Sequence, residues 1–202
     1  MSIRAVYFDL GGVIVRTEFQ TPRQHLAERL GIEYDGIVKA VFESETSRQA
    51  SIGAIREDEH WAAVIRKLHL PASQTQSFRD EFFAGDITDR KLLDFMRELR
   101  KTMKVGLISN AWSGLRPWIV KEKFDDAFDA MIVSAEVGVM KPDARIYQIA
   151  LDTLGVTPAE AVLLDDFPEN VEGARAVGMA AIHFTQPEQA LEELEQLLNK
   201  SR

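Results

Sequence analysis

Short apolar segments that each end at a polar residue constrain the fold of this chain most strongly. The first covers residues 3–8, is rich in β-forming residues, stops at Asp9 and is followed by two glycines. Similar segments follow at 104–108, 130–133 and 161–164, with a weaker fifth at 180–184. Apolar runs of this length, bounded by polar or turn residues, are typical of buried parallel strands.

Segments with helical periodicity lie between and after these runs, at 89–101, 144–154, 170–177 and 188–198. Strands that alternate with helices predict an α/β fold, a Rossmann-like doubly wound parallel sheet.

One region breaks this alternation. From about Thr21 to Phe83 the sequence consists of consecutive amphipathic helices, such as 23–30 and 56–68, with no convincing strand between them. We therefore expect a small helical cap inserted after strand one. The predicted division is a core of residues 1–16 and 85–202 and a cap of residues 17–84.

The charge and residue usage limit the possible partners. A net charge of −8 argues against binding of nucleic acid or of an anionic membrane surface. No apolar run reaches membrane-spanning length, and Asp9 interrupts the first one too early for a signal peptide, so we expect a cytoplasmic protein. The absence of cysteine excludes thiolate catalysis and cysteine-based metal sites. A small molecule is the expected partner, and the oligomeric state stays open.

Polar residues that follow the predicted strands are the candidates for chemistry, because ligands of open parallel sheets bind beyond the carboxyl ends of the strands. Each could be an ordinary helix cap or a solvated loop residue. Together they place carboxylates, a hydroxyl and an ammonium at one sheet edge, which suits a carboxylate nucleophile, a Mg²⁺ site and phosphate-binding donors. In chain order these residues are Asp9, Ser109, Asn110, Lys141, Asp165 and Asp166.

Four sequence motifs carry a family resemblance. They are VYFDLGGV from residue 6, LISN from residue 107, GVMKPD from residue 138, and LLDD from residue 163 followed by NVEGA from residue 170. In this order they resemble the four motifs of the haloacid dehalogenase-like superfamily, over nearly the whole chain. The helical insertion is similar to the small cap found after strand one in that superfamily.

The resemblance implies a role for each motif residue. Asp9 would attack phosphorus and become an aspartyl-phosphate. Mg²⁺ would be bound by the Asp9 carboxylate, the backbone carbonyl of Gly11 and Asp166, with Asp165 as a further ligand or directly behind the ligands. Ser109 and the backbone N–H of Asn110 would hold the phosphoryl oxygens. Lys141 would neutralise charge on Asp9 and on the transferred group.

Side chains outside the motifs give weaker candidates. Arg16 is the best placed of these to contact substrate, since it follows the first motif closely. Arg48 and Glu45 are expected on a solvated helix face. Trp112 is expected to pack against the helix that follows it rather than to line the pocket mouth, and Trp61 is expected in the core of the cap.

One departure from the family pattern leaves the function open. The usual general acid, an Asp two residues after the nucleophile, is replaced here by Gly11, and Asn170 stands where many members have another acidic residue. The chain resembles the Asp-Leu-Gly branch of the superfamily, which includes sugar-1-phosphate phosphatases and proteins similar to α-glucose-1-phosphate phosphatase. An anomeric leaving group needs less protonation than an ordinary alcohol.

We therefore favour a Mg²⁺-dependent phosphohydrolase of a small phosphorylated metabolite, with a sugar phosphate as one candidate. Two alternatives remain. A binding or regulatory protein could keep the fold without efficient turnover, and a metal-independent 2-haloacid dehalogenase would leave Asp165 and Asp166 unexplained.

Overall fold

A five-stranded parallel sheet forms the centre of the computed structural model, which describes residues 2–200. The strand order is β5-β4-β1-β6-β7, and each neighbouring pair is parallel. The strand bounds are β1 Ala5–Phe8, β4 Lys104–Ser109, β5 Ala130–Val133, β6 Ala161–Asp165 and β7 Ala180–His183. All five predicted strands are confirmed, and so is the doubly wound α/β fold.

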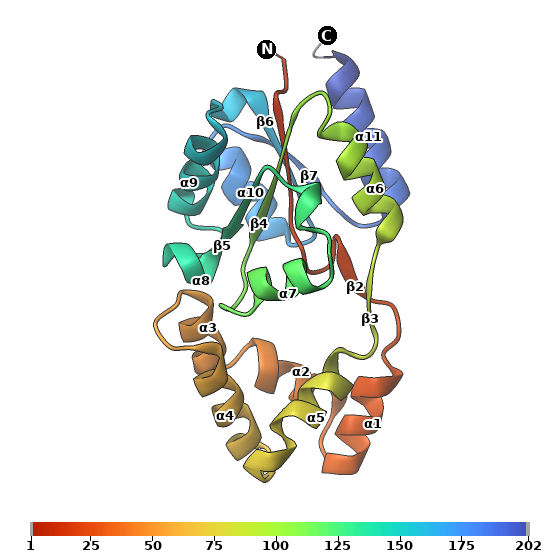
Figure 1. Cartoon of the computed structure of the whole chain (residues 1–202), viewed down its shortest axis with the longest axis vertical. Helices are drawn as coiled ribbons and strands as arrows, with labels where there is room; N and C mark the ends of the chain where they lie inside the picture. The colour runs from red at the N-terminus through yellow and green to blue at the C-terminus, as the bar shows by residue number, and fades with distance from the viewer. Residues whose placement is uncertain (1, 201–202) are drawn as a thin grey trace.

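Helices cover both faces of the sheet (Figure 1). Side chains alternate along β1, so Val6 and Phe8 pack against α6 and α11, whereas Ala5 and Tyr7 pack against α9. All four β1 side chains are fully buried, which explains why this strand is a continuous apolar run. The core helices are α6 Arg90–Leu99, α7 Leu115–Lys121, α8 Ser134–Val137, α9 Ala144–Leu154, α10 Pro168–Ala176 and α11 Pro187–Lys200.

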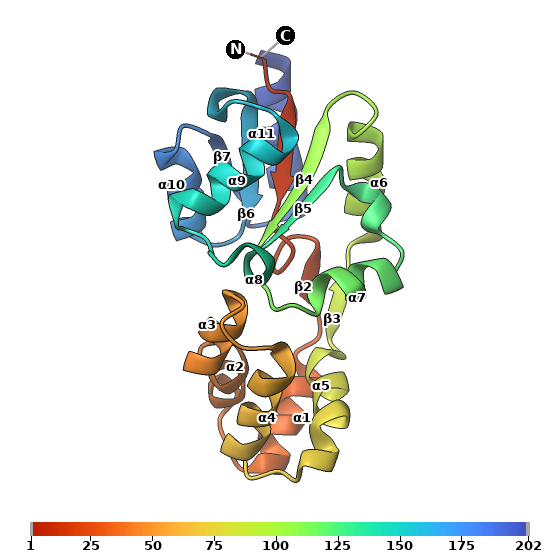
Figure 2. The ribbon, with the colours of Figure 1, turned by 60° about the vertical axis from the view of Figure 1, so that its left-hand side comes forward.

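The cap consists of five helices with a core of their own, and Figure 2 shows them grouped beyond one end of the sheet. The bounds are α1 Thr21–Leu30, α2 Tyr34–Phe42, α3 Glu45–Ser51, α4 Glu57–Lys67 and α5 Thr75–Phe83. Trp61 is fully buried in this cluster, as predicted. The division of the chain into units of 1–16 with 85–202, and of 17–84, stays a prediction.

Two short strands, which the sequence analysis did not predict, connect the cap to the core. Strand β2 (Val15–Thr17) pairs antiparallel with β3 (Asp86–Thr88), so the helical insertion follows β2 and does not come directly after β1. Three half-exposed residues per strand are too few to produce a recognisable pattern. Within residues 2–200 the remaining elements are three 3₁₀ turns, at Ala72–Gln74, Asp125–Ala127 and Pro158–Glu160. Among the described residues, no helix is long and apolar enough to span a membrane.

A half-buried ion pair ties the cap to these connecting strands. Arg23 of α1 donates from one nitrogen to both carboxylate oxygens of Asp86 at 2.8 Å, and from another to the carbonyl of Phe82 at 2.9 Å. The hydroxyl of Thr17 donates to the same carboxylate at 2.7 Å. Burial raises the pKa of Asp86 above its ordinary value, although Thr17 and Arg23 oppose the rise. The carboxylate therefore depends on these donors to stay ionised.

We predict that Arg23→Ala lowers the free energy of unfolding by about 2–4 kcal/mol near pH 7, because Asp86 keeps a desolvated charge without its cation. The loss should shrink as the pH falls toward 4, since the unpaired carboxyl binds a proton more readily than in the wild type. Urea unfolding across this pH range measures both effects. The control is Arg29→Ala, which breaks an exposed pair with Glu81 and should cost under about 1 kcal/mol. Equal losses in the two variants would contradict the prediction.

Candidate active site

A lysine ammonium between two carboxylates lies at the centre of the candidate site. Lys141 Nζ is 2.9 Å from Asp9 Oδ1 and 2.5 Å from Asp165 Oδ2, and the Lys141 side chain is fully buried. Asp9 follows β1 and Asp165 ends β6, so neighbouring parallel strands place the two carboxylates side by side. The Asp9 N–H donates to the carbonyl of Leu164 at 2.9 Å, which extends this pairing as far as Asp9.

Asp165 is held by donors on both of its oxygens. Oδ2 faces Lys141, while Oδ1 accepts the backbone N–H of Phe167 and the side-chain amide of Asn170, each at 2.9 Å. Asn170, which stands where many relatives carry an acid, therefore acts here as a donor to Asp165. This arrangement fixes Asp165 as the partner of Lys141.

Asp166 presents a different environment. Within the described part of the chain, its buried Oδ1 atom has no hydrogen-bond partner. Gly12 lies so close that a Cβ atom on it would overlap the Asp166 carboxylate, which accounts for glycine at this position of the first motif. Asp9, Asp165 and Asp166 each offer an oxygen within 4.8 Å of the others.

Among the described residues, the site contains three carboxyl groups but only one ammonium group. Burial raises the pKa of Asp9 to about 6, with Lys141 opposing the rise. Burial, together with the charges of Asp9 and Asp165, raises the pKa of Asp166 to about 7. For Lys141 burial favours a lower pKa, but the two carboxylates outweigh it and the pKa lies above its ordinary value. Three crowded carboxylates beside one ammonium, with an unpartnered oxygen among them, fit a hard divalent cation.

The predicted phosphate-binding residues lie at the end of the next strand. Ser109 ends β4, next to β1 in the sheet, and is buried. The Asn110 side chain bonds both backbone groups of Lys141, donating to its carbonyl at 2.9 Å and accepting its N–H at 2.7 Å. Asn110 thereby fixes the loop that carries the lysine. The structure thus brings five of the six predicted residues into one set of contacts, namely Asp9, Asn110, Lys141, Asp165 and Asp166.

The two remaining predicted residues, Gly11 and Arg16, have different surroundings. Outside Gly11 and its two chain neighbours, no heavy atom of residues 2–200 comes within 4 Å of the place that a Cβ on Gly11 would occupy. The Arg16 guanidinium bonds the carbonyl of Val13 at 2.7 Å, Glu18 at 3.0 Å and Asp89 at 2.9 Å. Its predicted contact with substrate stays a prediction, as do the roles assigned to the other site residues.

Three contacts near the site were missed from the sequence. The Ser134 hydroxyl bonds the backbone N–H of Ala111 at 2.9 Å. Glu57 of the cap bonds the N–H of Gly114 at 2.7 Å, and Trp112 packs into the aromatic cluster of the cap. All three pair residues far apart in the chain, and no local pattern signals them.

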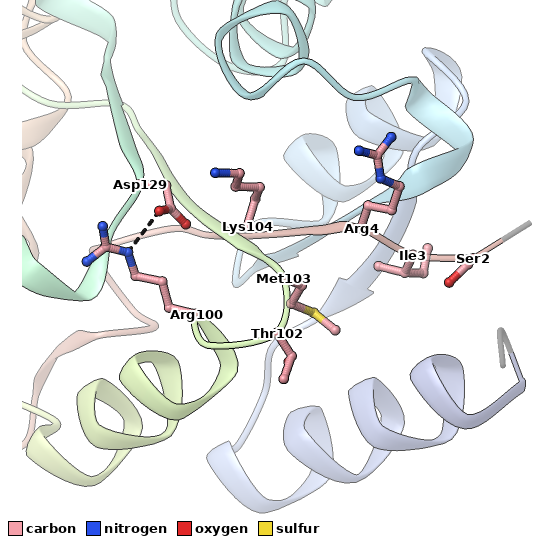
Figure 3. Close-up of a pocket in the computed structure, with 8 residues that line it drawn as sticks. All are labelled: Ser2, Ile3, Arg4, Arg100, Thr102, Met103, Lys104 and Asp129. Carbon is pink, nitrogen blue, oxygen red and sulfur yellow. Dashed lines mark hydrogen bonds and ion pairs between the residues drawn. The ribbon is translucent and has the colours of Figure 1, made fainter.

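A hollow of about 430 Å³ lies at the opposite edge of the sheet, where β1 and β4 begin (Figure 3). Arg100 pairs there with Asp129 at 2.9 Å, and Arg4 pairs with Glu160 at 3.2 Å. Asp129 also accepts the N–H of Val105, so these charges stabilise the sheet edge. The chemistry-bearing cluster is at the other end of the strands.

Two relatives found by sequence comparison align with nearly all of this chain. Bifunctional epoxide hydrolase 2 of Rattus norvegicus is 28% identical over 217 residues, covering 98% of this chain and 39% of that protein. The chain therefore spans about two fifths of the length of this relative. Sesquiterpene phosphatase astK of Aspergillus oryzae is 27% identical over 199 residues, covering 98% of this chain and 97% of that protein.

Solved structures share the fold. HAD family enzyme bt-2542 of Bacteroides thetaiotaomicron, crystallised with magnesium and inorganic phosphate, superimposes with a TM-score of 0.76 at 20% identity, covering 90% of this chain and 93% of that one. The sequence profile of the haloacid dehalogenase-like hydrolases matches residues 3–178. The matched range contains every residue of the buried cluster, and the chain belongs to the haloacid dehalogenase-like hydrolase family.

Proposed function

We propose that this protein is a Mg²⁺-dependent phosphohydrolase that cleaves a small phosphorylated metabolite through an aspartyl-phosphate on Asp9. The observation that carries the proposal is the buried cluster of Asp9, Lys141, Asp165 and Asp166, with its excess of carboxylates and its unpartnered Asp166 oxygen. The names of two relatives support phosphate chemistry, since one is a phosphatase and a solved relative holds magnesium and phosphate.

In the proposed reaction, an Asp9 oxygen forms a bond to phosphorus while the bond from phosphorus to the leaving oxygen breaks. Ser109 and the N–H of Asn110 hold the phosphoryl oxygens, and Lys141 neutralises charge beside Asp9. Asp9, Asp166 and the carbonyl of Gly11 would hold Mg²⁺, with Asp165 adjacent, and the ion would supply further charge stabilisation. Water then cleaves the acyl-phosphate and releases inorganic phosphate.

The leaving group is the finer part of the proposal. Because Gly11 supplies no acid, the oxygen departs with little protonation, so esters of acidic oxygens should react best. Aryl, acyl and anomeric sugar phosphates share this property. A sugar 1-phosphate is accordingly one candidate for the natural substrate.

We predict that Asp9→Asn lowers phosphatase activity by at least about 10³-fold, because the amide keeps the shape of the side chain but is no nucleophile. Turnover of p-nitrophenyl phosphate with Mg²⁺ measures this loss, and the melting temperature tests whether the variant is folded. Chloride release from a 2-haloacid serves as the parallel test of dehalogenase chemistry. A folded variant that retains substantial phosphatase activity would rule out Asp9 as the nucleophile.

Substitution of Asp165 and of Asp166 should impair different steps, catalysis and Mg²⁺ binding respectively. Asp166→Asn should raise the Mg²⁺ concentration for half-maximal activity by about tenfold or more, since it removes a charged ligand. Asp165→Asn should mainly lower kcat, because an amide cannot match Lys141 on one oxygen and the two N–H donors on the other. Mg²⁺ titrations of activity separate the two. If Asp165→Asn raised the Mg²⁺ requirement as much as Asp166→Asn does, the result would indicate that Asp165 binds the ion directly.

Gly11→Asp should help poor leaving groups most. The space around Gly11 accepts a side chain, and a carboxyl there could protonate the leaving oxygen. General acid catalysis is worth about 10²- to 10⁴-fold, so kcat/KM for alkyl phosphates should gain more than kcat/KM for aryl phosphates. The measurement is the dependence of kcat/KM on leaving-group acidity in both proteins. A flat dependence in the wild type, with chemistry rate-limiting, would show that another group donates the proton.

A further inference from the structure

The segment between β4 and α7, residues 110–114, is bound from two sides. Its first residues are fixed by the core, through the bonds of Asn110 to the Lys141 backbone and of the Ala111 N–H to Ser134. Its last residues are bound by the cap. The segment that begins beside the proposed phosphate-binding donors therefore also forms a connection between the two halves of the molecule.

Glu57, the first residue of α4, provides the polar contact on the cap side. One carboxylate oxygen accepts the N–H of Gly114 at 2.7 Å. The other accepts the Trp61 indole N–H at 3.1 Å and the Arg79 guanidinium at 2.6 Å. The Glu57 side chain is only 14% exposed. Because two cap residues fix the carboxylate, its third bond fixes Gly114 relative to the cap.

The local sequence suits this close approach. A Cβ atom on residue 114 would overlap the Glu57 carboxylate, so a larger residue would push the segment away from the cap. This contact explains a glycine at the start of α7, where its backbone conformation is one that any residue can adopt.

Trp112 adds an apolar contact to the polar one. Its ring centroid lies 4.5 Å from that of His60, 5.4 Å from Trp61 and 5.9 Å from Phe42, all in the cap. The aromatic contacts stabilise the packing of the segment against the cap. The hydrogen bond from the Gly114 N–H adds a directional contact that fixes the orientation of the segment. The end of the segment, at Trp112 and Gly114, is thus held by the cap in its observed position.

We infer that Glu57 is a positioning residue, which holds segment 110–114 so that Ser109 and the Asn110 N–H are placed for phosphoryl transfer. This inference rests on the proposed function, because those donors hold the phosphoryl group in it. A displacement of about 1 Å in such a group can cost about 10²-fold in rate. Loss of the Glu57 contact should therefore impair catalysis although Glu57 touches no reacting atom.

The kinetic test compares Glu57→Ala, Glu57→Gln and the control Glu81→Ala, which removes a carboxylate paired with Arg29 inside the cap. Glu57→Ala should lower kcat/KM for p-nitrophenyl phosphate by about 10- to 100-fold, mostly in kcat. Glu57→Gln should retain most activity, because its amide oxygen can still accept the Gly114 N–H although the charge facing Arg79 is lost. Glu81→Ala should stay within about twofold of the wild type.

Hydrogen exchange at the Gly114 amide gives a readout that does not need activity. Exchange should be faster in Glu57→Ala than in the wild type, and unchanged in Glu81→Ala. A wild-type protein that hydrolyses no phosphate ester would overturn the proposed function, whereas the exchange data would still test the Glu57 contact. Unchanged exchange in Glu57→Ala would overturn the inference, and so would equal kinetic losses in Glu57→Ala and Glu57→Gln or in Glu57→Ala and Glu81→Ala.

Discussion

The ammonium of Lys141 has no contact with solvent and lies against the carboxylates of Asp9 and Asp165. A charge this deeply buried is stable only where opposite charges and hydrogen bonds replace water. Satisfying Lys141 therefore requires that β1 and β6 end together, that the loop after α8 enters the sheet edge, and that Asn110 fixes the backbone of that loop. The adjacency of β1 and β6 and the position of the lysine loop are thus linked through one buried charge.

The burial of Lys141 also gives the adjacent residues Asp165 and Asp166 different surroundings. Both carboxylate oxygens of Asp165 accept hydrogen bonds, from Lys141, Phe167 and Asn170. Asp166, by contrast, has a buried oxygen without a hydrogen-bond partner among the described residues. Burial raises the pKa values of Asp9 and Asp166, and the neighbouring carboxylates add to the rise although Lys141 opposes it. A divalent cation would compensate these carboxylates. The pair thus combines a residue that orients the lysine with a residue suited to a metal.

Much of the core could be predicted because its signals are local. The apolar run at 130–133 matches β5, because a strand buried on both faces needs consecutive apolar residues. The periodicity at 144–154 matches α9, because the spacing of apolar residues along a helix is visible in the local sequence. The positions of Asp9, Asn110, Lys141 and Asp165 after the strands predicted that they would lie together, because parallel strands bring their carboxyl ends to one edge of the sheet. Strands β2 and β3 were missed because three residues carry no period. The partners of Arg16 and Asp165 could not be predicted, because they depend on which loops meet in space.

The contact of Glu57 with Gly114 matters more in a chain that has glycine at position 11. Without an acid to assist the leaving oxygen, rate enhancement must come from placing the phosphoryl group and from stabilising its charge. In the proposed reaction, both depend on the accuracy with which Ser109 and the Asn110 N–H are held. Residues 110–114 would serve both needs in that reaction, since the core binds their beginning and Glu57 and the aromatic cluster around Trp112 bind their end. An enzyme that lacks one catalytic group is expected to be most sensitive to the contacts that position the rest.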